Sequence, residues 1–162
     1  MNTAPTETKR RKAKRALYAG GHPTAEAKAV HRRFVRGPLP RLLPIACVLQ
    51  VKGRVSGKTT EIPLAIIRFH GSWYLASMLE GTSNWVKNVR AAHGRARLLH
   101  GRWRDVSLVE IPPTERAPIL KRYLLFAWSA RAHFSIPWRA PLDEYERIAP
   151  LHQVFRVEKG QP

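Results

Sequence analysis

The segment VKGRVSGKTTEIPL, residues 51–64, joins a glycine-rich cationic turn to the start of a strand. The phosphate-binding loop of nucleoside triphosphatases has four residues between its first glycine and a Gly-Lys-Ser/Thr triplet, whereas Gly53 and Gly57 enclose three. The residues that follow are rich in β-branched side chains and include Pro63, so they predict a strand where such a loop needs a helix. The segment therefore predicts a turn between two strands. An anion could bind there to free backbone amides and to the side chains of Arg54, Ser56 and Lys58.

Three apolar runs around this turn predict strands. They are IACVLQV, TEIPLAIIRF and WYLASM, at residues 45–51, 60–69 and 73–78. Because a tight turn at residues 69–72 separates the second run from the third, we expect an antiparallel meander.

The middle of the chain changes to helical periodicity. Residues 81–94, GTSNWVKNVRAAHG, predict a short amphipathic helix that Thr82 or Ser83 would cap and Gly94 would end. Residues 95–111 return to strand character and predict another strand pair, with a kink or bulge expected at Gly101.

The last third predicts one more helix and a closing strand. Residues 114–128 carry apolar side chains at helical spacing, with Thr114 as a cap, and residues 151–158 have the pattern of a strand. This order of elements favours an α+β fold that is mainly β. We expect a small closed or split β-barrel, with a helix inserted between strands and helices at the barrel openings.

The chain is strongly basic, with 29 Lys and Arg against 11 Asp and Glu, a net charge of +18 over 162 residues. A helix is expected to end at Arg36, before Gly37-Pro38. We expect residues 1–30 to form a basic, flexible extension and residues 31–162 to form a single domain. Two interpretations of the run KRRKAKR at residues 9–15 stay open. It is a solvated tail, or it is an arm that makes weak contact with nucleic acid or an anionic membrane.

Several classes of protein are excluded by what the sequence lacks. No apolar run is long enough to cross a bilayer and no signal peptide is evident, which predicts a cytoplasmic protein, with peripheral membrane contact through the basic arm as an addition. The single cysteine, Cys47, lies in an apolar run and predicts a packed core thiol. No metal-ligand spacing, nucleophile motif or carboxylate pair is present, so no catalytic side chain is assigned. An enzyme would need a bound cofactor to carry the chemistry.

Four motifs in order, GRVSGKTTEIPL, YLASMLEG, NWVKNVRA and PLDEYERIAPLHQVFRV, resemble the deazaflavin-dependent nitroreductase family over residues 31–158. The resemblance implies a split β-barrel of the flavin-reductase type, often a homodimer, that binds coenzyme F420 or another flavin-like or tetrapyrrole ligand. It implies hydride transfer from the reduced deazaflavin to a small electron-poor acceptor such as a quinone or a nitroaromatic compound.

The resemblance also implies a cofactor site with two parts. The cationic turn would bind the phosphodiester and glutamate carboxylates of the coenzyme tail, and an apolar slot between strands would hold its tricyclic ring. Trp85 and Asn88, one helical turn apart, would close the slot. The candidate residues are Lys52, Gly53, Arg54, Val55, Ser56, Gly57, Lys58, Pro63, Leu64, Ala76, Ser77, Met78, Trp85 and Asn88.

The sequence departs from the family pattern at three positions that commonly carry basic residues. Val55, Thr60 and Met78 are neutral, and each lost charge-assisted contact would weaken binding by ~1.5–3 kcal/mol. Cations that could compensate are Lys52, Arg54, Lys58, Lys87 and Arg90. A tyrosine that some members present to substrate is Ala65 here, and the remaining candidates for an acceptor-side wall are Tyr123, Trp128, Phe134 and Trp138.

Two alternatives stay open. The barrel could bind FMN, FAD or haem in place of coenzyme F420, as an enzyme or as a carrier. The chain could also be a nucleic-acid or membrane-surface binding module that acts through its basic residues, with polyanion affinity that falls steeply with salt.

Overall fold

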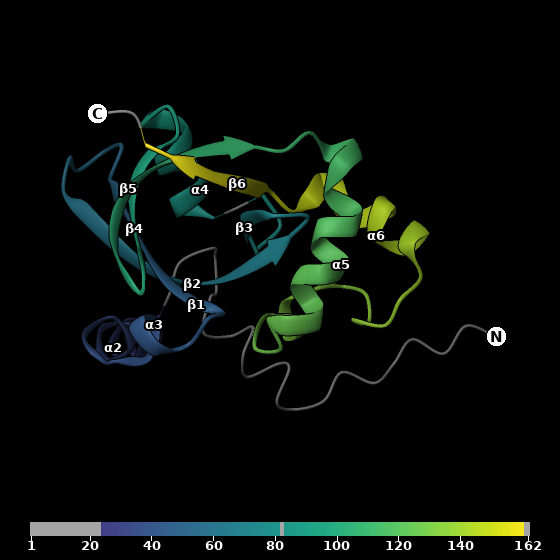
Figure 1. The fold of residues 1–162 in the computed structure, drawn as a ribbon, viewed down its shortest axis with the longest axis horizontal. Helices are drawn as coiled ribbons and strands as arrows, with labels where there is room; N and C mark the ends of the chain where they lie inside the picture. The colour runs from purple at the N-terminus through teal and green to yellow at the C-terminus, as the bar shows by residue number, and fades with distance from the viewer. Residues whose placement is uncertain (1–23, 82, 161–162) are drawn as a thin grey trace.

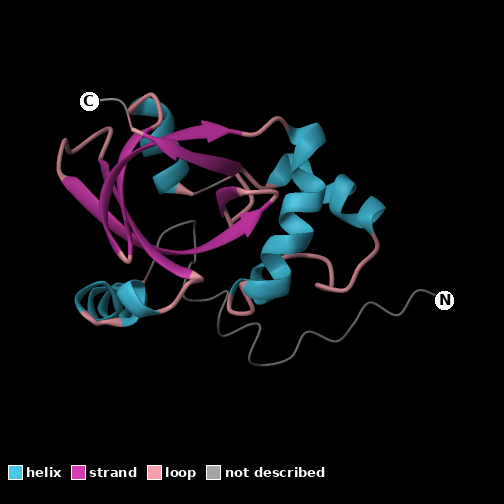
Figure 2. Cartoon of the chain, viewed as in Figure 1, coloured by secondary structure: helices cyan, strands magenta, loops and turns pink. Residues whose placement is uncertain are grey.

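The computed structural model describes residues 24–81 and 83–160, which form a six-stranded antiparallel barrel with helices around it (Figures 1 and 2). The strand order around the closed barrel is β1-β2-β3-β6-β5-β4. The strands are β1 (Ala46–Lys52), β2 (Thr59–Phe69), β3 (Ser72–Ala76), β4 (Arg95–His100), β5 (Arg102–Glu110) and β6 (Val154–Lys159). The predicted split barrel is confirmed. The basic run at residues 9–15 lies outside the described residues.

The α-helices pack against the barrel and against one another. The α-helices are α2 (Ala25–Arg36), α3 (Leu39–Leu42), α4 (Asn84–Ala91), α5 (Arg116–Phe126) and α6 (Leu142–Ile148). Short 3-10 helices are η2 (Pro113–Glu115), η3 (Ala130–His133) and η4 (Ala149–Leu151). Helices α5 and α6 pack side by side at one end, and α2 and α3 lie against β2 and β1 (Figure 1). In the described part of the chain no helix is both long and apolar enough to cross a membrane.

The barrel splits along the first half of β2. Residues 59–65 of this strand pair with β1, but only residues 66–69 pair with β3, so residues 59–65 have one open edge. The Ile66 amide donates to Ile45 on the β1 side, and alternation along the strand therefore turns the nitrogen of Pro63 toward the open edge. Proline lacks an N–H and is tolerated there because no neighbouring strand needs a donor.

Turn chemistry explains several boundaries. His70 and Gly71, both with positive φ (45° and 82°), form the predicted tight turn between β2 and β3. Helix α4 ends at Ala91 with Ala92 as its C-cap residue, before the expected end at Gly94. Gly94 has a φ of +79° and donates to the Val89 carbonyl at 2.9 Å, and a Cβ there would lie 2.6 Å from the Leu108 carbonyl oxygen. The expected kink at Gly101 is a full reversal, since His100 pairs with Arg102 and the predicted strand pair is a hairpin of β4 and β5.

Two predicted helix caps differ from the structure. Ser83 is the N-cap residue of α4, but its hydroxyl makes no cap hydrogen bond because it bonds to Ser77. Thr114 lies inside η2, and α5 begins two residues later without a side-chain cap. Thr82 lies outside the described residues. The expected boundary between extension and domain, at residues 30 and 31, falls inside α2.

The apolar residues form two cores. One fills the barrel and includes Leu49, Leu75 and Phe155, and the other packs α5 and α6 against the barrel through residues such as Leu120 and Tyr145. Cys47 is fully buried in the barrel core, and burial raises the pKa of its thiol, so the predicted core thiol is confirmed.

Candidate functional site

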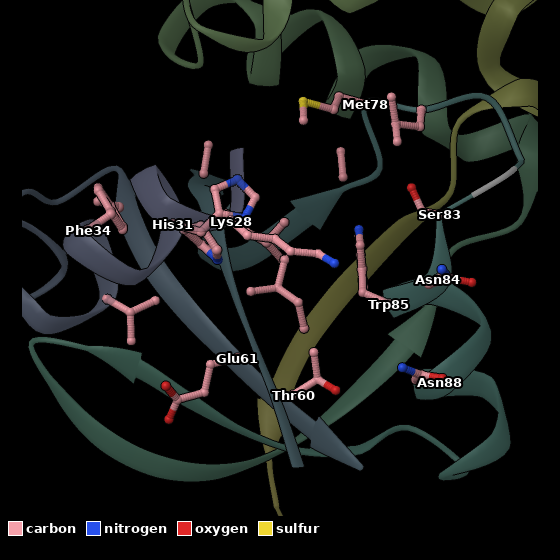
Figure 3. Close-up of a pocket in the computed structure, with 18 of the residues that line it drawn as sticks. Lys28, His31, Phe34, Thr60, Glu61, Met78, Ser83, Asn84, Trp85 and Asn88 are labelled. Carbon is pink, nitrogen blue, oxygen red and sulfur yellow. The ribbon is translucent and has the colours of Figure 1, made fainter. Parts of the chain in front are cut away.

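A cavity of about 970 Å³ opens beside the free edge of β2 (Figure 3). Its walls come from five segments: α2, the β1–β2 turn with the first half of β2, the loop after β3, α4, and the C-terminal end of α5. The size is that of a typical ligand site. The cavity therefore exists because β2 runs on beyond its pairing with β3.

Ten of the fourteen residues predicted for the cofactor site line this cavity. They are Gly53, Arg54, Val55, Ser56, Pro63, Leu64, Ala76, Met78, Trp85 and Asn88. The other four, Lys52, Gly57, Lys58 and Ser77, lie outside its lining. Segments far apart in the sequence are thus brought to one place.

Most amides of the glycine turn bond to the protein itself. Gly53 donates to the Lys58 carbonyl at 2.8 Å, and Gly57 donates to the Gly53 carbonyl at 2.9 Å. The Lys58 amide donates to the Ser56 hydroxyl at 3.3 Å. Within the described residues, the amides of Val55 and Ser56 have no such acceptor. The expected free amides are therefore reduced to the tip of the turn, which faces the cavity.

The side chain of Asn88 fastens this turn to α4. Its Oδ1 accepts from the backbone N–H of Arg54 at 3.2 Å and from Nη1 of Arg54 at 3.0 Å. A weaker bond of 3.4 Å joins Nη2 of Arg54 to Oδ1 of Asn84. The side chain of Asn88 is only 8% exposed, and both hydrogen bonds that its amide oxygen accepts come from Arg54. The arrangement fixes the guanidinium of Arg54 at the cavity wall.

Trp85 forms the neighbouring part of that wall. It is largely buried, and its ring packs at a tilt against Phe155 with centroids 5.5 Å apart. Figure 3 places it on the side of the cavity opposite α2. Trp85 thus belongs both to the barrel core and to the cavity.

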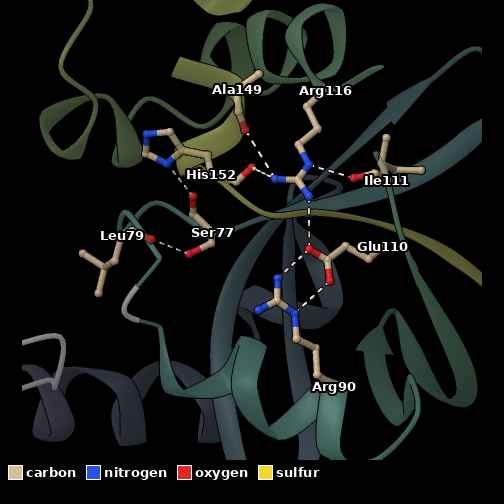
Figure 4. Close-up of polar contacts among 8 residues, drawn as sticks. All are labelled: Ser77, Leu79, Arg90, Glu110, Ile111, Arg116, Ala149 and His152. Atoms are coloured by element: carbon tan, nitrogen blue, oxygen red, sulfur yellow. Dashed lines mark hydrogen bonds and ion pairs between the residues drawn. The ribbon is translucent and has the colours of Figure 1, made fainter. Parts of the chain in front are cut away.

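Ser77 supports the cavity from behind. It is fully buried, and its hydroxyl donates to the Leu79 carbonyl at 2.9 Å, so Ser83 donates in the 2.6 Å bond between the two hydroxyls. The Ser77 carbonyl accepts from Nδ1 of His152 at 2.9 Å (Figure 4). Ser83 itself lines the cavity. This network fixes the loop that leads from β3 into α4.

His152 is a neutral core histidine. It is fully buried and stacks on Phe134 with centroids 4.1 Å apart. Burial lowers its pKa, and among the described residues its Nε2 has no partner. With the proton on Nδ1, the ring orients the Ser77 carbonyl rather than reaching the cavity.

Helix α2 supplies a wall that was not predicted. Lys28, His31, Arg32, Phe34, Val35 and Arg36 all line the cavity. The sequence predicted a helix here, but half of it was assigned to an extension. The structure buries one residue of this helix, Ala27. This small apolar residue is the one feature of the segment that indicates packing of the helix against the rest of the chain.

The C-terminal end of α5 and the turn after it supply two of the four residues expected on the acceptor side. Tyr123 and Trp128 line the cavity, whereas Phe134 stacks on His152 and Trp138 lies in a separate groove. Burial raises the pKa of Tyr123, which keeps its phenol protonated. Ala65 also lines the cavity.

The charges around the cavity are mainly positive. Lys28, Arg32, Arg36 and Arg54 line it, against one lining carboxylate, that of Glu61, which accepts from Gln50 at 3.1 Å. Of the cations expected to compensate for neutral Val55, Thr60 and Met78, Arg54 faces the cavity. Arg90 instead pairs with Glu110 at 2.7 Å, and Lys52, Lys58 and Lys87 lie outside the lining.

The site fits a flat, anionic cofactor. Its lining joins apolar residues at the open edge of β2 to a fixed arginine and two open amides at the turn, which are the two kinds of contact that a ring with an anionic tail needs. Across the described ranges no group of three His, Cys, Asp or Glu residues could hold a metal ion.

Comparisons with models of protein families and with curated proteins find no match. Among solved structures, a protein of unknown function from Agrobacterium tumefaciens has a TM-score of 0.51 and 15% identity, over 80% of this chain and 57% of its own. An F420-H2 dependent reductase has a TM-score of 0.48 and 21% identity, over 70% of this chain and 94% of its own. A domain-swapped dimer has a TM-score of 0.48 and 20% identity, over 92% of this chain and 96% of its own.

At these identities the likeness concerns the fold. The fold that the sequence motifs predicted is confirmed at that level: the chain is a split β-barrel.

Proposed function

We propose that this protein is an oxidoreductase that binds reduced coenzyme F420 in the cavity beside β2 and passes its hydride to a small electron-poor acceptor. The observation that supports the proposal is the convergence of three sequence motifs on one cavity. Arg54 and Pro63 from the first, Ala76 and Met78 from the second, and Trp85 from the third all line it.

The residues of the chain would bind and orient the reactants. A reduced deazaflavin supplies hydride donation, so no side chain needs to act as a nucleophile. Trp85 and the open edge of β2 would hold the ring and exclude water, while Arg54 and the amides of Val55 and Ser56 would bind the anionic tail. Tyr123 lines the cavity at the end of α5, and its phenol would serve as a hydrogen-bond donor to the acceptor.

Coenzyme fluorescence provides the test, because Arg54 and Lys58 are exposed cations of the same turn and only Arg54 lines the cavity. Arg54→Ala should weaken binding at least about tenfold, the effect of one charge-assisted contact. Lys58→Ala, the control of equal charge, should bind within about threefold of wild type. Equal losses in the two variants, or no binding by wild type, would contradict the proposal.

A second candidate ligand is FMN, which carries a single phosphate. The neutral Val55, Thr60 and Met78 all line the cavity, and this reduces the charge available for a polyanionic tail. An absorption spectrum of the purified protein separates the candidates, since flavin, deazaflavin and haem absorb at different wavelengths.

A further inference from the structure

We infer that the electron acceptor is an anion, a carboxylate- or sulfonate-bearing aromatic compound such as a charged quinone, held by the cations of helix α2. The inference rests on the proposed function, because it assigns the second reactant of the same cavity. Its residues are Lys28, Arg32 and Arg36.

The cavity has two separate positive walls. Lys28, His31 and Phe34 of α2 lie on one side, and Ser83, Asn84, Trp85 and Asn88 lie on the other (Figure 3). Arg54 belongs to the second side, because it is bonded to Asn88 at 3.0 Å. A coenzyme whose tail binds at Arg54 leaves the cations of α2 for another ligand.

The cations of α2 are available to a ligand. In the part of the chain that the structure describes, none of Lys28, Arg32 and Arg36 forms a salt bridge. The side chain of Lys28 points into the cavity (Figure 3). Glu61 offsets one positive charge on this side, and its oxygen is already bonded to Gln50. The α2 wall therefore keeps a net positive charge next to apolar surface.

These features define the chemistry of the acceptor. Apolar side chains of the same wall, Phe34 and Val35, with Leu64 of β2, would contact a flat ring, and the lysine and arginines would pair with its anionic group. In the reaction the acceptor gains the hydride and one proton from solvent. One proton leaves the reduced ring for solvent, so that atoms, electrons and charge balance.

Binding can be measured without the coenzyme, because Trp85 and Trp128 line the cavity and report on occupancy. The probes are oxidised naphthoquinone and the same ring bearing a sulfonate, each titrated by tryptophan fluorescence. Lys28→Gln and Arg32→Gln should each weaken sulfonate binding about three- to fivefold, as expected for an exposed charge pair beside apolar surface. Both should leave binding of the neutral quinone within about twofold.

Arg33→Gln is the matched control: it removes the same charge from the same helix at a position outside the cavity lining. This variant should bind both probes like wild type. With reduced coenzyme, KM for the sulfonate should rise in Lys28→Gln and Arg32→Gln, and KM for the neutral quinone should not.

The outcomes separate this inference from the proposed function. If Lys28→Gln and Arg32→Gln weaken coenzyme binding and not sulfonate binding, the α2 wall holds the coenzyme tail and the inference is wrong while the proposed function stands. Equal losses for the two quinones, or an equal loss in Arg33→Gln, would also overturn it. If wild type prefers the sulfonate but binds no coenzyme, the proposed function falls and the anion-binding wall stands.

Discussion

At the level of single residues, Asn88 connects the first and third of the motifs that meet at the site. Its side-chain oxygen accepts hydrogen bonds from the backbone N–H and from the guanidinium of Arg54, which lies 34 positions earlier in the chain. Positions of the turn that line the cavity could be predicted from the sequence, but the partner of each amide could not. That partner depends on how close α4 packs to the turn, which no local pattern encodes.

Removal of the Asn88 amide should release the turn. We expect Asn88→Ala to lower the free energy of unfolding by about 1–3 kcal/mol, because two donors lose a largely buried acceptor. Coenzyme binding should weaken about tenfold, since Arg54 is no longer held in place. Urea unfolding and a fluorescence titration measure the two effects.

Two further variants serve as controls for Asn88. Asn88→Asp keeps an acceptor oxygen and should retain most of the coenzyme affinity. Lys87→Ala changes an exposed neighbour on the same helix and should leave stability and affinity unchanged. Wild-type affinity in Asn88→Ala would show that the turn does not depend on α4.

At the level of elements, Arg116 fixes the start of α5 against the approach to β6. It is 5% exposed and donates to the carbonyls of Ile111 at 2.7 Å, Ala149 at 3.4 Å and His152 at 3.1 Å (Figure 4). It also pairs with Glu110 at 3.1 Å. One buried cation thereby holds together three segments behind the cavity.

Arg116→Met should destabilise the fold strongly. A side chain of similar length without donors leaves the carbonyls of Ile111 and His152 without this partner, at a cost of roughly 2–4 kcal/mol in urea unfolding. Ala149 keeps the His152 amide as a donor, and Glu110 keeps its pair with Arg90. Arg122→Met, on the exposed face of the same helix over Phe126, is the control and should change stability little. A small effect at Arg116 would mean that packing alone fixes α5.

The elements themselves were predictable where local pattern decides. The first three strands match the expected runs to within two residues, because β-branched runs bounded by turns leave few alternatives. The short helix α6 was not predicted, and Gly101 reverses the chain where a kink was expected. Both depend on what the segment packs against, as does the docking of α2 through Ala27.

For the molecule as a whole, the buried His152 makes stability depend on pH. Its pKa is lowered mainly by burial, so the unfolded chain binds a proton at this site more readily than the folded chain. Above pH 6.5, the ordinary pKa of histidine, the neutral His152 ring contributes fully to the free energy of unfolding. This contribution is lost as the pH falls below that value. Burial lowers the pKa of His31 in the same direction.

We expect the free energy of unfolding to fall between pH 7 and pH 5, with at most about 1.4 kcal/mol per pH unit for this one site. His152→Gln should flatten the profile in this range, whereas His93→Asn, at an exposed turn position, should keep the wild-type slope. Glu110 loses its ion pairs only at lower pH, because Arg90 lowers the pKa of its carboxyl group. An unchanged slope in His152→Gln would exclude this origin.

Equilibrium dialysis of the purified protein against coenzyme F420, FMN and haem tests the central claim most directly. The account predicts that the chain retains coenzyme F420 more tightly than the other two, at micromolar concentration and one molecule per chain. Retention should fall in Arg54→Ala and not in Lys58→Ala. Tighter retention of FMN or haem, or equal retention by wild type and Arg54→Ala, would contradict the assignment of this cavity to a deazaflavin.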